Sequence, residues 1–144
     1  MIFDCFKKEP TYPWIEAAKG ELGIKEIPGI KHEERILEYF RATTLGSKED
    51  EVPWCAAFVS WCLPHNGTSS AWARSYLNYG KPLASPKYGC IVVFDRGDNK
   101  CHVGFYVGRQ NGKLKILGGN QNDCVCIKEF PTDRVLSYRW PVDA

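Results

Sequence analysis

The sequence lacks a long hydrophobic run, a strong net charge and any internal repeat. No stretch of about 18 apolar residues occurs in the chain of 144 residues, so we expect no transmembrane helix and no membrane insertion. Residues 1–14 hold no apolar core ahead of their lysines and prolines, so we expect no secretory signal. A formal net charge of +2 is too small to argue for nucleic acid as a partner. What remains is a chain of ordinary composition, 44% hydrophobic and 25% charged, with the length of one domain.

Cysteine, by contrast, is abundant. The chain has seven, an odd number, so at least one thiol stays free even if the others pair: Cys5, Cys55, Cys62, Cys90, Cys101, Cys124 and Cys126. Without a secretory signal, the reduced state is the default expectation. Disulfides among the sheet cysteines stay open, because sequence cannot give their pairing. A zinc site from Cys90, Cys101, His102, Cys124 and Cys126 is an alternative, although the C-x₂-C spacing is absent and neighbours in a strand point to opposite faces.

The hydrophobic pattern divides the chain into a helical half and a β-rich half. Helices are predicted at about 13–22, 32–42, 55–63 and 71–78, and strands at 90–95, 102–107, 113–117, 124–128 and 136–140. Asn111–Gly112 marks a hairpin turn between two of these strands. Helices followed by a mostly antiparallel sheet define an α+β fold. We expect residues 13–144 to form a single catalytic domain, preceded by an extension at 1–12.

The segment PWCAAFVSWC, residues 53–62, predicts a helix with a cysteine in its first turn. Pro53 suits a helix start, because its missing N–H would have had no partner there. Cys55 would then lie where free backbone N–H groups and the helix dipole favour an anion. Because helix N-termini lower the pKa of cysteine, we predict a stabilised, nucleophilic thiolate at Cys55.

A cysteine nucleophile needs a general base, usually a histidine. We expect His32 and His65 to be solvated, whereas His102 opens an apolar strand directly after a turn and is the candidate base. A third group should orient the imidazole. Asn120, with Gln121 as the fallback, follows the next strand and would lie close to His102, although Gly-Gly-Asn is also an ordinary turn sequence.

Five segments together resemble a known group of enzymes: PWCAAFVSWC, YGCIVVFDRG, HVGFYVG, ILGGNQ and YRWP. They are similar to the papain-like peptidoglycan amidases and endopeptidases of the CHAP type (cysteine, histidine-dependent amidohydrolase/peptidase) and the NlpC type, over about residues 13–141. The resemblance implies a papain-like fold, with N-terminal helices on a mostly antiparallel sheet and Cys55 as nucleophile at a helix N-terminus. It also implies His102 as base. Many CHAP members carry an acidic residue where Gly118 stands, which here favours Cys-His-Asn, with Asn120 as the third catalytic residue.

The resemblance further implies a hydrolase that cleaves an amide bond of bacterial peptidoglycan through an acyl-enzyme, with no cofactor and no metal. Trp54, Trp72 and Gln121 are candidates for binding the substrate. We expect a monomer that is made without a signal peptide and acts in the periplasm or at the cell wall. It would be a phage lysin or a type VI secretion effector, the latter with a secretion carrier and an immunity protein as partners. A non-catalytic wall- or peptide-binding module of the same fold and a zinc-binding sheet protein are the alternatives.

Overall fold

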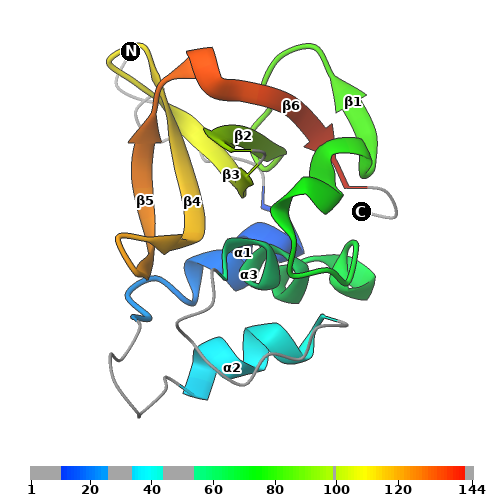
Figure 1. Cartoon of the computed structure of the whole chain (residues 1–144). Coiled ribbons are helices and arrows are strands. Elements are labelled where there is room, and N and C mark those ends of the chain that lie inside the picture. The colour runs from blue at the N-terminus through cyan, green and yellow to red at the C-terminus, as the bar shows by residue number, and fades with distance from the viewer. Residues whose placement is uncertain (1–10, 26–33, 44–53, 99, 142–144) are drawn as a thin grey trace.

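The computed structural model describes residues 11–25, 34–43, 54–98 and 100–141. Three α-helices precede six strands (Figure 1). The α-helices are α1 Pro13–Lys19, α2 Glu34–Arg41 and α3 Cys55–Cys62; the 3₁₀ helices are η2 Pro64–Asn66, η3 Ala73–Asn78 and η4 Thr132–Arg134. The strands are β1 Lys81–Leu83, β2 Ile91–Gly97, β3 Lys100–Gln110, β4 Lys113–Gln121, β5 Cys124–Phe130 and β6 Val135–Trp140.

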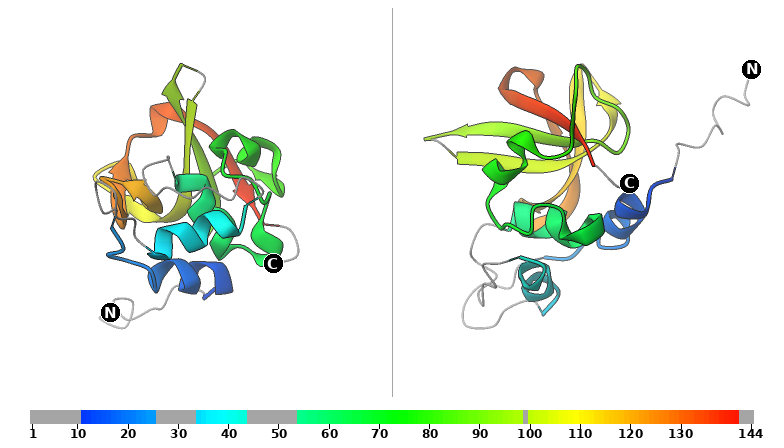
Figure 2. Two further views of the ribbon diagram at one scale, coloured as in Figure 1. Left: turned by 60° about the horizontal axis from the view of Figure 1, so that its bottom comes forward. Right: turned by 90° about the vertical axis from the view of Figure 1, so that its right-hand side faces the viewer.

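All six strands form one antiparallel sheet in the order β1-β6-β2-β3-β4-β5. The sheet is strongly curved, and the α-helices lie together on one side of it (Figures 1 and 2). Helix α3 contacts β3 and β4 on one side and α2 on the other, so it is the middle layer of the molecule. The α+β architecture predicted from the sequence is confirmed.

Helix α3 occupies this middle layer because it has no polar face. Seven of its eight residues are buried, and Trp61 alone is partly exposed. A helix that is hydrophobic all round must be covered on every side. Strand β4 approaches it closely at Gly119, where an added Cβ would lie 2.6 Å from the Trp54 ring and 2.8 Å from Phe58. Glycine at this position therefore lets the sheet meet the first turn of α3.

A partly buried ion pair fixes the outer helix. Glu21 receives two hydrogen bonds from the Arg35 guanidinium, at 2.6 and 2.8 Å, and a third from the Tyr39 hydroxyl at 2.7 Å. The Arg35 hydrogen bonds lower the pKa of the Glu21 carboxyl and keep it ionised. The network ties the end of α1 to α2, and thereby holds α2 over α3.

The two faces of the sheet carry separate apolar clusters. The first cluster packs the helices against one face and includes Cys55, Cys101 and Val103. The second cluster lies on the other face and includes Cys90 and Phe94. Since neighbouring residues of a strand alternate between faces, consecutive residues of β3 belong to different environments. This alternation decides where His102 points.

Most predicted elements are present, with four differences. The helix expected at 71–78 is the 3₁₀ helix η3, and β1 was not predicted. Helix α1 ends at Lys19 rather than at 22, and β4 continues through 118–119 to Gln121 instead of ending in a turn. The Asn111–Gly112 hairpin is confirmed, with positive φ angles of 55° and 75°. The expected loops at 26–30 and 45–52 lie outside the described residues. Within the described residues, no helix is long and apolar enough to cross a membrane.

Candidate active site

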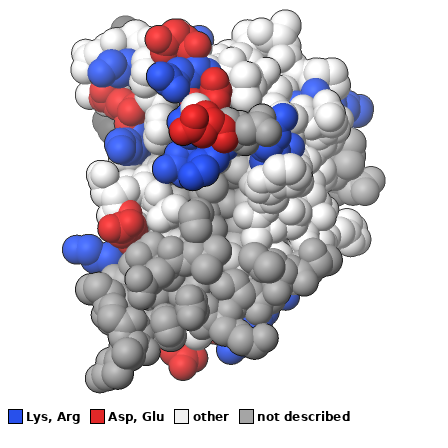
Figure 3. All heavy atoms as spheres, in the orientation of Figure 1, with Lys and Arg blue, Asp and Glu red and all other residues white. Residues whose placement is uncertain are grey.

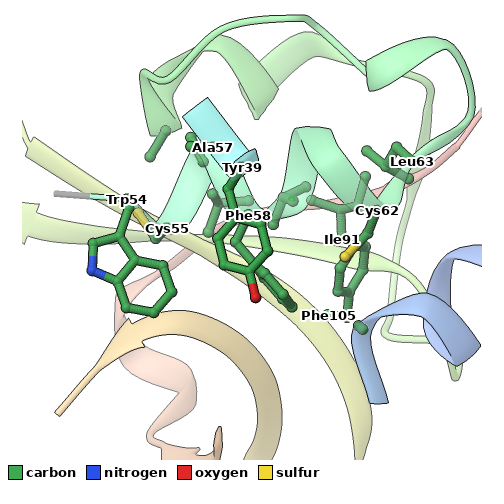
Figure 4. Close-up of a cluster of buried hydrophobic side chains, with 14 of the residues drawn as sticks. Tyr39, Trp54, Cys55, Ala57, Phe58, Cys62, Leu63, Ile91 and Phe105 are labelled. Carbon is green, nitrogen blue, oxygen red and sulfur yellow. The ribbon is translucent and has the colours of Figure 1, made fainter. Parts of the chain in front are cut away.

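Cys55 is the first residue of α3, as predicted. Trp54 precedes it as the N-cap residue and offers no side-chain hydrogen bond, and Pro53 lies outside the described residues. The Cys55 side chain is only 4% exposed. Figure 4 shows it at one end of the helix, with Cys62 at the other end. The thiol is therefore at the positive end of α3, but it is not open to solvent.

The electrostatic prediction for Cys55 is wrong in its net direction. Burial raises the pKa of the thiol, although backbone N–H groups of Val103, Ala56 and Cys55 itself and the positive charge of Arg96 oppose this effect. Desolvation penalises the charged form, and one helix terminus does not compensate for it. Cys55 in the free protein is therefore a neutral thiol rather than a stabilised thiolate.

The sheet opens where the Cys55 thiol meets it. Strands β3 and β4 pair from Gln110–Lys113 up to Phe105–Leu117, and β4 then diverges. Beyond that point, the backbone of Val103 has no paired residue in β4, and its N–H donates to the Cys55 thiol. Val103 directly follows His102, so the thiol contacts the backbone next to the candidate base.

The imidazole of His102 lies on the opposite face of β3 from Cys101 and Val103, which belong to the same cluster as Cys55. It is 5% exposed and stacks on the Phe130 ring, with 5.3 Å between centroids. Its Nε2 lies 2.9 Å from Oε1 of Gln121, the last residue of β4. The His102–Gln121 hydrogen bond thus joins β3 to β4 where their backbones have separated.

The surroundings of Gln121 determine the tautomer of His102. The Gln121 Nε2 donates to the carbonyl oxygens of Ile116, at 3.1 Å, and Cys126, at 2.9 Å. With its amide nitrogen committed to two acceptors, Gln121 presents its oxygen to the imidazole. The Nε2 of His102 must therefore carry the proton in the neutral ring. This leaves Nδ1 of His102 unprotonated and able to accept a proton.

Burial also keeps the imidazole neutral. It lowers the pKa of His102 to about 4, with smaller contributions in the same direction from the charges of Arg96 and Lys128 and an opposing one from Gln121. At neutral pH the candidate base is consequently unprotonated. Together with the raised pKa of Cys55, this gives a neutral thiol and a neutral imidazole rather than an ion pair.

This low pKa predicts a pH-dependent stability. Between about pH 4 and pH 6.5 the unfolded chain binds a proton at His102 that the folded protein does not bind, so the free energy of unfolding rises with pH. Above pH 6.5 the contribution is constant. A shift from 6.5 to about 4 corresponds to about 3 kcal/mol. Urea unfolding of the wild type and of His102→Gln across this range measures the difference, and the variant should show the flatter profile.

A matched control for this titration is His65→Gln, which removes an exposed histidine outside the site. It should retain the pH profile of the wild type. If His102→Gln and the wild type lose the same stability between pH 6.5 and pH 4.5, the imidazole is not the group responsible.

A pocket of about 410 Å³ opens beside His102. It is lined by Phe94, Asp95, Arg96, His102, Asn120, Gln121, Asn122, Lys128, Phe130, Pro131 and Arg134. This volume is typical of small-ligand sites. Cys55 is not among the residues that line the pocket. Sequence reasoning missed the contribution of β5 and the η4 segment, because no motif there signals a site.

The predicted site residues divide into those that the structure brings together and those that it does not. Asn120 lines the pocket with a φ of 56°, but the amide bonded to the imidazole is that of Gln121, so the structure favours the fallback over Asn120 as the third group. Gln121 is 2% exposed but lines the pocket, so its role in substrate binding stays a prediction.

The two tryptophans that we predicted to bind substrate have opposite surroundings. Trp54 is fully buried and stacks on Tyr39, with 5.9 Å between centroids, so it belongs to the core and has no surface to offer a ligand. Trp72 is 64% exposed and does not line the pocket beside His102. Its role in substrate binding stays a prediction.

The remaining cysteines are dispersed. All six described cysteines are free thiols. Cys101 packs with the helices, whereas Cys90 lies in the second cluster on the opposite face. Cys124 and Cys126 both donate to the Gln121 backbone oxygen, at 3.2 and 3.3 Å. Within the described residues, no three His, Cys, Asp or Glu side chains come close enough to hold a metal ion.

The protein thus combines a cysteine at a helix N-terminus with a strand-borne histidine that is hydrogen-bonded to a glutamine side chain, and these are residue types that thiol hydrolases use. A family model for the CHAP domain matches residues 47–120, slightly more than half of the chain. The chain belongs to the CHAP domain family, which confirms the resemblance seen in the sequence. Membership indicates a cysteine hydrolase or amidase that acts on peptidoglycan. No curated protein matches the chain.

Proposed function

We propose that this protein hydrolyses an amide bond of the peptidoglycan peptide by a thiol mechanism, with Cys55 as nucleophile and His102 as general base. The observation that carries the proposal is the hydrogen bond between Nε2 of His102 and the Gln121 oxygen, from which the tautomer of His102 follows. The Gln121 oxygen accepts from Nε2, so Nδ1 is the free basic nitrogen on a residue whose neighbour, Val103, contacts the Cys55 thiol. Family membership supplies the substrate class.

The raised pKa of Cys55 and the lowered pKa of His102 favour proton transfer during attack, not before it. As the sulfur attacks the carbonyl carbon, Nδ1 of His102 accepts the thiol proton. The backbone N–H groups of Cys55 and Ala56 belong to the first turn of α3 beside the sulfur, and they would stabilise the tetrahedral oxyanion. Collapse breaks the C–N bond, and the imidazolium gives its proton to the leaving amine.

The second half of the reaction regenerates the thiol. Water attacks the thioester carbonyl while His102 accepts one of its protons. The C–S bond breaks, the peptide leaves as a carboxylic acid, and the proton returns to the Cys55 sulfur. Each turnover thus consumes one water and one amide, and releases one amine and one acid.

Digestion of purified peptidoglycan tests the proposal. The reaction is run with a thiol reductant and a metal chelator, and new amino groups and new reducing sugar ends are measured in parallel. We expect amino groups to appear and reducing ends to stay at background, and mass spectrometry of the fragments then names the bond. New reducing ends without new amines would show a glycosidase instead. Absence of both products would reject hydrolysis of the wall.

Gln121 and Asn120 make a discriminating pair of variants. Gln121→Met keeps an unbranched side chain of similar length but removes the oxygen that fixes the tautomer, so we expect kcat to fall about 10- to 100-fold with a smaller change in KM. Asn120→Gly removes the side chain and tolerates the positive φ, and its kcat should fall by less than about threefold. Steady-state rates on soluble wall fragments measure both.

NMR spectroscopy distinguishes a change in the tautomer and orientation of His102 from general damage to the fold. The ¹⁵N shifts of His102 should show Nε2 protonated in the wild type and a mixture of tautomers in Gln121→Met. If Asn120→Gly carries the larger loss of kcat, or if the tautomer is unchanged in Gln121→Met, then Gln121 is not the orienting group.

A further inference from the structure

The pocket beside His102 contains more positive charge than negative. Arg96, Lys128 and Arg134 line it together with a single acid, Asp95. The Asp95 carboxylate accepts a hydrogen bond from the Gly97 backbone N–H at 2.8 Å. Among the residues that the structure describes, none of the three cations forms an ion pair. All three are exposed and thus accessible to a ligand, and Lys128 also lies over the Phe130 ring, with its Nζ 5.7 Å from the centroid.

These cations reach the reacting groups. The charge of Arg96, near the end of β2, lowers the pKa of both Cys55 and His102, and Lys128 of β5 also acts on His102. Arg134 of η4 donates to the Asp95 backbone oxygen at 3.4 Å, which holds it beside the end of β2. Basic and acidic side chains lie interspersed on the sheet side of the molecule in Figure 3. The positive charges of the pocket lining thus lie near the candidate catalytic residues.

We propose that this pocket binds a free carboxylate of the substrate, so that the preferred substrate is a wall peptide with a carboxylate close to the bond that is cleaved. This rests on the proposed function, whose substrate it specifies. Arginine recognises a carboxylate through paired N–H groups, and lysine adds a point charge. The rings of Phe94 and Phe130 supply an apolar wall, while the side chain of Asn122 offers hydrogen bonds to peptide amides.

The size and composition of the pocket support a small anionic group over an extended polymer. A volume of about 410 Å³ suits one or two amino-acid residues rather than a glycan strand. Asp95 in the wall disfavours a ligand with several negative charges, such as a phosphate polymer. The lining has a surplus of two positive charges, which one carboxylate facing Arg96 and Lys128 halves.

Binding of the carboxylate should also change the pKa of His102, the candidate base. Because Arg96 and Lys128 help to hold the pKa of His102 down, an anion placed between them raises it. The substrate would then strengthen the imidazole as a proton acceptor at the moment of binding. This coupling gives a readout that does not depend on turnover.

A pair of synthetic stem peptides tests the proposal. The two have the same sequence, one with free carboxylates and one with each carboxylate converted to a carboxamide. Binding is measured by NMR on Cys55→Ala, so that neither peptide is consumed. We expect the carboxylate peptide to bind about tenfold more tightly at low salt, and to lose most of this advantage at high salt.

Two variants then test whether the preference for the carboxylate peptide depends on the charge of Arg96. Introducing Arg96→Gln into Cys55→Ala should reduce the tenfold preference to less than about threefold. Lys113→Gln is the matched control, because it removes an exposed positive charge at the start of β4, outside the pocket. It should retain the preference. The His102 ring signals should show a raised pKa with the carboxylate peptide alone.

Equal affinity for the two peptides, no binding of either, or a preference that survives Arg96→Gln would each overturn the carboxylate pocket. These results are independent of the proposed function, which is tested by release of amino groups from the wall by the wild type. A protein that cleaves the wall but binds both peptides equally would retain the function and lose this inference. A protein that prefers the carboxylate peptide but releases no amines would retain this inference and lose the proposed function.

Discussion

Replacing Cys55 by serine is expected to lower kcat on peptidoglycan by at least about a thousandfold. Loss of the nucleophile in a well-assembled hydrolase has effects of this order or larger. The substitution changes one atom of a side chain that is 4% exposed, so packing around the first turn of α3 is preserved. The loss should therefore appear in kcat rather than in the folded fraction.

The size of the loss follows from the two titrating groups. The pKa of His102 is lowered to about 4, so its imidazole is a weak base. It can assist a thiol, which is intrinsically far more acidic than an alcohol although burial raises the pKa of Cys55. A serine hydroxyl is far less acidic, and the same imidazole cannot activate it to a comparable degree.

Cys62→Ser is the matched control for this prediction. Cys62 is also buried and ends the same helix, but it lies at the end away from the opening between β3 and β4 (Figure 4). Wall hydrolysis, measured by release of amino groups, should stay near the wild-type level in the folded protein. Activity within tenfold of the wild type in Cys55→Ser would contradict the assignment, as would an equal loss in a well-folded Cys62→Ser.

The parts of the fold that could be predicted are those with strong local signals. The hairpin at Asn111–Gly112 was predictable because a two-residue turn needs positive φ angles that these residues adopt. The sequence predicts that strand β4 ends at residue 117, because the Gly-Gly pair that follows favours a turn. Gly118 and Gly119 are strand residues, where glycine gives space for the Trp54 ring and for the Gln121 side chain. That need is set by tertiary contacts, which local patterns do not contain.

The candidate site likewise has features that the sequence predicts and features that it does not. The helix-start position of Cys55 follows from the sequence, and so does the proximity of a residue at 120 or 121 to His102. The choice between Asn120 and Gln121 depends on the divergence of β4 and on two carbonyl acceptors, Ile116 and Cys126, contributed by neighbouring backbone. Neither is visible in the sequence of the motif.

The protonation state of Cys55 shows a second limit. Sequence reasoning considers the helix terminus, which stabilises a thiolate. Burial acts in the opposite direction and dominates, because the thiol is enclosed between α3 and the sheet. How deeply a helix terminus is covered depends on the elements that pack on it. The sign of the pKa shift therefore could not be obtained from position in the helix.

Replacing His102 by glutamine is expected to lower kcat by about 10²- to 10⁴-fold, the usual contribution of a general base. Glutamine can still donate to the Gln121 oxygen, so the link between β3 and β4 has a substitute. It cannot accept the thiol proton. The matched control is His65→Gln, which should retain the wild-type rate. A folded His102→Gln protein that hydrolyses the wall within tenfold of the wild type would exclude His102 as the base.

The pH profile of the wild type gives a second test of the same residue. Protonated His102 cannot accept a proton, so kcat/KM should fall only as pH falls through about 4, rather than near the ordinary histidine value of about 6.5. Circular dichroism at each pH separates this loss from unfolding. If a bound carboxylate offsets the charges of Arg96 and Lys128, the acid limb of kcat, which reports the complex, should lie at higher pH than that of kcat/KM. Coincident limbs, measured on a carboxylate-bearing substrate, would mean that the pocket and the base are not coupled.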